Sequence, residues 1–88
     1  MHMASGKQSP SGPLAVAVAA EVRAAMGRQR VSGIQLATLT GISQNYVAKR
    51  LRDEAPFTLN DVERICEVLG EDFTELITNA AAHIRNGK

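Results

Sequence analysis

The sequence has little cysteine and few aromatic residues, and it contains no tryptophan. With only Tyr46, Phe57 and Phe73 as aromatic side chains, a folded core has to be aliphatic. The single cysteine, Cys66, cannot form an intramolecular disulfide, which argues against a small secreted domain and favours a reducing, cytoplasmic compartment. No apolar run approaches the roughly 20 residues of a membrane span. The 88 residues are expected to form one small domain with a marginal core.

Acidic residues are missing from the middle of the chain. None lies between Val22 and Asp53, whereas six basic residues do: Arg23, Arg28, Arg30, Lys49, Arg50 and Arg52. From Asp53 onward, eight acidic residues stand against three basic ones. The net charge of +1 therefore hides a cationic half and an acidic half. A cationic end on a small chain indicates a phosphate-bearing partner, and the acidic half is expected to face away from it.

Helix caps and apolar periodicity predict an all-α fold, a compact five-helix bundle. Residues 1–12 begin like a cloning remnant and are expected to form a disordered tag or N-terminal arm, with the domain at residues 13–88. Pro13 suits the first position of the first helix, and Gly27 weakens its end. The expected core stripe of this helix is Leu14, Val18, Val22 and Met26.

The other four helices have side-chain signals at their starts. The expected N-cap residues are Ser32, Ser43, Thr58 and Asp72. Gly41 and Gly70 are expected to end the helices before them, because glycine tolerates a positive φ. The last helix is expected to bury Phe73, Leu76, Ile77, Ala80 and Ile84. Its tail, residues 80–84, either packs on the first helix or forms a homodimer contact.

Residues 33–52 show the layout of a helix-turn-helix, in which two short helices are joined by three residues beginning with glycine. A close helix crossing needs a small side chain, which Ala37 supplies. The two helices are expected to be held together by the aliphatic side chains of Leu36, Ile42, Val47 and Leu51. Ile34 and Leu39 are expected near the surface, and Cys66 in the core.

This arrangement leaves polar side chains at the start of the second of these helices pointing away from the core. Amide side chains pair with adenine and lysine donates to guanine, so base contacts are expected from Gln44, Asn45, Tyr46 and Lys49. For Tyr46, a partly buried packing role is the alternative. Phosphate contacts fix register without reading sequence. They are expected from Ser43, Arg50, Arg52, Arg28, Arg30, Gln35 and Gly33.

Residues 32–77 resemble the lambda-repressor-like (Cro/cI-type, XRE) DNA-binding domain. The resemblance is carried by Leu36-Ala37, Gly41-Ile42-Ser43-Gln44, Phe57-Thr58-Leu59, Val62 to Leu69, Gly70 and Phe73 to Ile77. It implies five helices with the third in the major groove, in a phage repressor, host regulator or antitoxin. Two positions depart from the family pattern: Gly33 stands where glutamine is frequent, and Arg50 where an aliphatic residue is usual.

We therefore expect a transcriptional regulator that binds a specific sequence of double-stranded DNA. The leading interpretation is a phage or bacterial repressor that occupies an operator, in the bacterial cytoplasm at the nucleoid and acting in phage immunity. A homodimer through the last helix is a further expected partner; no enzyme activity, cofactor, metal or small-molecule substrate is expected. The alternatives are a protein-interaction module such as an antitoxin, and the DNA-binding part of a transposase or recombinase.

Overall fold

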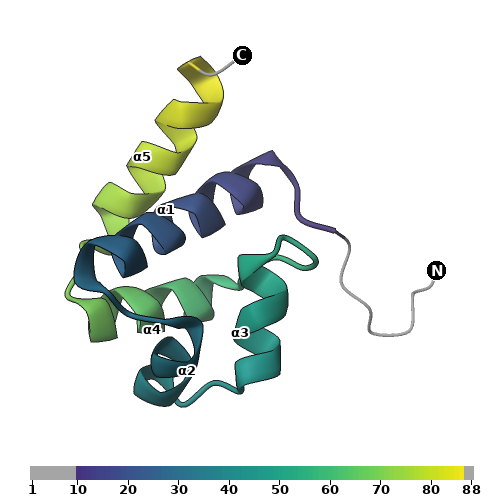
Figure 1. Cartoon of the computed structure of the whole chain (residues 1–88). Coiled ribbons are helices and arrows are strands. Elements are labelled where there is room, and N and C mark those ends of the chain that lie inside the picture. The colour runs from purple at the N-terminus through teal and green to yellow at the C-terminus, as the bar shows by residue number, and fades with distance from the viewer. Residues whose placement is uncertain (1–9, 87–88) are drawn as a thin grey trace.

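Five α-helices form the part of the protein that the computed structural model describes, residues 10–86, and no strand lies in that range (Figure 1). Residues 1–9 of the predicted N-terminal arm lie outside it, and Gly12 is the N-cap of the first helix. The all-α prediction is confirmed. The helices are α1 Pro13–Gln29, α2 Gly33–Thr40, α3 Gln44–Leu51, α4 Leu59–Leu69 and α5 Phe73–Asn86.

The predicted caps fix where α2 and α4 begin. Ser32 Oγ accepts the amide of Gln35 at 3.0 Å, and Gln35 Oε1 accepts the amide of Ser32 at 2.8 Å, which closes a capping box. Thr58 and Asp61 form a second box at α4, with distances of 3.0 and 2.9 Å. These reciprocal bonds satisfy amides that the first turn of a helix leaves without a partner.

The ends of α2 and α4 agree with the glycine signals, and α1 ends without a glycine cap. Gly41 and Gly70 have φ angles of 78° and 68°, as predicted. α1 ends at Gln29, two residues after Gly27, and its C-cap is Arg30, a non-glycine residue with a φ of 58°. The exposed Gly27 weakens a helix without breaking it. The amide of Val31 bonds to Met26 O at 2.9 Å, which secures this longer end.

Long polar side chains cap the C-terminal ends of three helices from neighbouring elements. Arg23 Nη1 donates to Leu51 O of α3 at 2.7 Å. In the same way, Arg64 Nε donates to Thr40 O of α2 at 3.3 Å, and Gln29 Nε2 donates to Leu69 O of α4 at 2.8 Å. Because the last carbonyls of a helix lack intrahelical partners, these bonds also fix how the helices meet.

The core is aliphatic, and its largest fully buried side chains are Leu36, Ile65, Val22 and Val47. Cys66 is also buried among them, as expected. Four expected core residues are not fully buried: Leu14 is 46% exposed, Ile84 is 39% exposed, and Phe73 and Ile77 are partly buried against the core. The last turns of α5 extend beyond the other helices (Figure 1).

Candidate DNA-binding surface

The helix-turn-helix lies at the end of the molecule opposite the C-terminal half of α5 (Figure 1). Gly41 makes the left-handed turn between α2 and α3, and Ala37 is buried at their crossing, as predicted. Leu36 and Val47 are buried between the helices, whereas Ile42 and Leu51 are only partly buried against the same core. The turn and the small side chain together bring α3 close to α2 and leave its other side open.

The open side of α3 carries polar side chains without internal partners. Gln44, Asn45 and Lys49 are exposed. At 3.6 residues per turn, Asn45 and Lys49 share a face roughly opposite the buried Val47. None of the three side chains forms a hydrogen bond or ion pair within residues 10–86. These three side chains therefore point away from the core, as the sequence predicted.

Tyr46 is placed differently from the other expected base contacts. Its hydroxyl donates to Asp61 Oδ2 at 2.7 Å, and the same oxygen accepts the amide of Thr58 at 2.9 Å. The guanidinium carbon of Arg50 lies 3.6 Å from the centre of the Tyr46 ring. Burial, followed by the hydrogen bond to Asp61, raises the pKa of Tyr46 above its ordinary value. The structure favours the packing alternative, because Tyr46 connects α3 to the start of α4.

Ion pairs reduce the positive charge of the predicted cationic segment. Arg52 pairs with Glu54 at 2.7 Å and Arg28 with Glu71 at 3.3 Å, both across exposed surface. Arg23, which caps α3, lies 3.9 Å from Asp53. Three of the six basic residues thus have an acidic neighbour. The acidic half was expected to face away from a phosphate-bearing partner, but Asp53, Glu54 and Asp61 contact α3 or its supports and so lie close to the candidate surface.

The expected phosphate contacts are split between two places. Arg28 lies against Glu71 at the turn between α4 and α5, together with Gln29. Arg30 is exposed, and within the described residues its side chain has neither a hydrogen bond nor an ion pair. It lies beside the exposed Ile34 and Leu39 of α2, which are at the surface as predicted. Arg28 and Arg30 are close in sequence but belong to different surfaces.

The start of α2 adjoins the start of α3. A hollow of about 300 Å³ is lined by Ser32, Gly33, Ile34, Gln44, Ala48 and Leu51. Gly33 is the first residue of α2, and its amide belongs to the first turn, where amides lack intrahelical partners. Gln35 and Ser43 are used as caps: Gln35 accepts from Ser32, and Ser43 Oγ accepts the amide of Tyr46 at 3.2 Å. The hollow therefore places the first turn of α2 beside Gln44 of α3.

A family model described as helix-turn-helix (HTH_3) matches residues 20–76, which is more than half of the chain. The chain belongs to the XRE-type helix-turn-helix family. This match confirms the resemblance seen in the sequence. The XRE-type domain is thus a DNA-binding domain of transcriptional regulation, and not an enzyme.

The XRE-type domain shares its fold with two crystal structures of the clp gene regulator ClgR from Corynebacterium glutamicum, each 21% identical in sequence. One gives a TM-score of 0.73 and covers 82% of this chain and 94% of the ClgR chain. The other gives 0.75, with 86% and 81% covered. At this identity the likeness shows the fold alone. No curated protein sequence matches the chain.

Metal and membrane features are absent from the part of the XRE-type domain that the structure describes. No three histidine, cysteine or acidic side chains gather there as a metal site would require. No helix in that range is long and apolar enough to cross a membrane. Burial raises the pKa of the Cys66 thiol, so this side chain stays protonated in the core.

Proposed function

We propose that this XRE-type domain binds a specific operator in double-stranded DNA and acts as a bacterial or phage repressor, with α3 in the major groove. The observation that carries the proposal is the polar face of α3, whose exposed side chains lack internal partners next to the free amides of α2. An α-helix fits the major groove, where each base pair presents a distinct set of donors and acceptors. A regulator bound there would block polymerase at the nucleoid.

Base reading is assigned to Gln44, Asn45 and Lys49. Each good pair with a base contributes roughly 1–3 kcal/mol of discrimination. Tyr46 is assigned a positioning role, because its hydroxyl is bonded to Asp61 and one face of its ring is covered by Arg50.

Phosphate binding is assigned mainly to backbone groups at the start of α2 and to the exposed cations Lys49 and Arg30. The amides at Gly33 and Ile34 form a positive helix end, which favours an anion. Lys49 and Arg30 are exposed and form no ion pair within the described residues, whereas Ser43 is the N-cap of α3 and Arg50 lies in its last turn. Gln35 supports this end by fixing the backbone of Ser32. Arg28 has no part in the proposal, because Glu71 holds it at the turn between α4 and α5.

The test starts with selection of binding sites from random double-stranded DNA. Recovery of one motif supports the operator proposal, and a palindrome also indicates a working dimer. Asn45→Ala is then expected to lower the preference for that motif by about 5- to 150-fold, while affinity for random DNA stays the same. Asn79→Ala is the matched control, because it removes the same exposed side chain from α5. Equal effects of the two substitutions would place base reading elsewhere.

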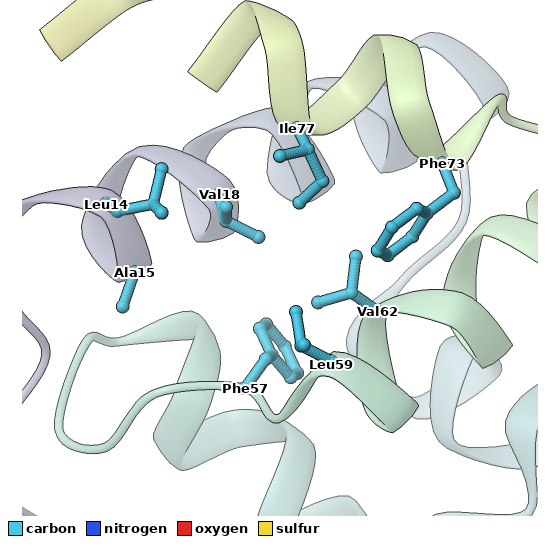
Figure 2. Close-up of a pocket in the computed structure, with 8 residues that line it drawn as sticks. All are labelled: Leu14, Ala15, Val18, Phe57, Leu59, Val62, Phe73 and Ile77. Carbon is cyan, nitrogen blue, oxygen red and sulfur yellow. The ribbon is translucent and has the colours of Figure 1, made fainter. Parts of the chain in front are cut away.

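A protein contact is the second candidate, in the form of either a homodimer through α5 or a toxin-like partner. The observation in its favour is an open apolar hollow of about 300 Å³ between α1, α4 and α5 (Figure 2). It is lined by Leu14, Ala15, Val18, Phe57, Leu59, Val62, Phe73 and Ile77. Light scattering of the domain and of Leu59→Glu tests the homodimer, since Leu59 is 71% exposed at the edge of the hollow. If both samples are monomeric, the homodimer is contradicted, and the DNA-binding proposal then concerns a monomer.

A further inference from the structure

The residue that follows α3, Arg52, is bound by an acidic side chain two positions further on. Arg52 Nε donates to Glu54 Oε2 at 2.7 Å, and its Nη2 donates to Oε1 at 3.3 Å. The guanidinium therefore binds both carboxylate oxygens, which is the geometry it would also use for a phosphate. Both side chains are about half exposed, so this pair is part of the surface beside α3.

Both members of the pair are charged at neutral pH. The hydrogen bond from Arg52 is the largest cause that lowers the pKa of Glu54, and the charge of Lys49 adds to it. The bond to Glu54 in turn raises the pKa of Arg52. The pair thus carries no net charge. The positive charge of Lys49 in α3 also acts on the Glu54 carboxylate. Glu54 therefore opposes the attraction that both cations exert on DNA.

A phosphate that approaches Arg52 has to compete with this carboxylate. If the guanidinium turns to the phosphate, it loses two bonds, and Glu54 is left as a bare negative charge close to the DNA backbone. If the pair stays closed, Arg52 contributes no net attraction. In either case Arg52 adds less to binding than an unpaired arginine would, since phosphate attraction is mainly electrostatic.

We infer that Glu54 masks Arg52 and thereby lowers the affinity of this surface for DNA of any sequence. The inference rests on the proposed function, because it concerns the same surface of α3. Glu54 is in this sense a specificity-determining residue. Binding to random DNA is almost entirely electrostatic, so each added cation strengthens the binding that competes with the operator.

The test compares four variants on random-sequence duplex DNA at several salt concentrations: Glu54→Gln, Arg52→Gln, the double variant, and Glu67→Gln. Glu67 is the matched control, because it forms an exposed ion pair with Arg64 at 2.9 Å on α4. Circular dichroism confirms that each variant is folded. The measured quantities are the dissociation constant and its dependence on the logarithm of salt concentration.

Glu54→Gln is expected to bind random DNA more tightly and to steepen the salt slope by about 0.9. Its advantage over the unchanged protein should then shrink by roughly 3.5-fold between 50 and 200 mM salt. Arg52→Gln should weaken binding, because it leaves Glu54 unpaired. The double variant removes both charges and should bind within about twofold of the unchanged protein, since a masked arginine contributes no net attraction. Glu67→Gln should change little.

Two results would overturn the inference. If the double variant binds as weakly as Arg52→Gln while Glu54→Gln has no effect, Arg52 contacts phosphate regardless of Glu54. If Glu54→Gln and Glu67→Gln tighten binding equally, only the total charge matters. Failure of the proposed function is a separate result, in which the unchanged protein selects no motif. In that case the comparison of the four variants still tests whether Glu54 masks Arg52, because it is made on random-sequence DNA.

Discussion

The bond between Tyr46 and Asp61 allows a direct test of what positions α3. The substitution is Tyr46→Phe, which removes the hydroxyl and keeps the ring under Arg50. A hydrogen bond to a charged group contributes about 1.5–3 kcal/mol, and partial exposure of this site reduces the expected value to about 1 kcal/mol. For a domain of this size, the melting temperature should fall by roughly 4–8 °C.

The assay has two readouts, thermal denaturation and discrimination between the selected operator and random DNA. Asp72→Ala is the control, because it removes the bond from the Glu75 amide to Asp72 Oδ1 at the start of α5 and leaves the bond between Tyr46 and Asp61 in place. Loss of this cap costs about 1 kcal/mol, similar to the expected loss at Tyr46. Both variants should be less stable, but only Tyr46→Phe should lose discrimination.

The reasoning would be refuted by equal discrimination in the two variants at equal stability. It would also fail if Tyr46→Phe left the melting temperature unchanged. A double-variant cycle with Asp61→Asn separates the pair from its surroundings, because the effect of Tyr46→Phe should be smaller once the carboxylate is gone.

Three further outcomes follow from the same structure. Three of the six basic residues are in ion pairs, so the affinity for DNA should fall only about 40-fold between 50 and 200 mM salt. Six phosphate contacts would instead imply a fall on the order of 10³-fold, and a fluorescence anisotropy titration distinguishes the two values. The folded state raises the pKa of the Tyr46 hydroxyl, so the contribution of this hydroxyl to stability should be complete below about pH 10 and lost as the pH rises further. Denaturant melts over this pH range should therefore show a smaller loss of stability for Tyr46→Phe than for the unchanged protein. Cys66 should resist alkylation in the folded protein and react once denaturant is added, which mass spectrometry would show.

Local signals made the fold predictable. The serine and threonine caps form hydrogen bonds over three residues, and Gly41 and Gly70 supply backbone angles that other residues rarely adopt. Such features depend on sequence neighbours, so a single sequence contains them. The end of α1 was harder to predict, because the residue with a positive φ there is Arg30 and not a glycine.

The candidate surface was predictable only in part, for the same reason. Exposure of Gln44, Asn45 and Lys49 follows from helical periodicity once Val47 is assigned to the core. The positions of the cations do not follow from periodicity. Arg28 and Glu71 are far apart in the chain, and counting charges by segment treats them as opposite halves of the molecule. Arg52 and Glu54 are only two residues apart at the end of α3, so the sequence spacing could have suggested their ion pair.

The residues that hold α3 in position lie outside the face that is proposed to read DNA. The exposed side chains of α3 have no internal partners, so their positions in space depend on how the helix is held. α3 is held by Arg23 of α1 at its C-terminal carbonyl and by Asp61 of α4 through Tyr46, and Val47 fixes its rotation in the core. A base contact depends on the donor lying within hydrogen-bond distance of a base edge, so a small rotation of α3 would weaken all of its contacts together. Substitutions at Arg23 or Asp61 should therefore alter operator preference although neither residue is assigned a DNA contact.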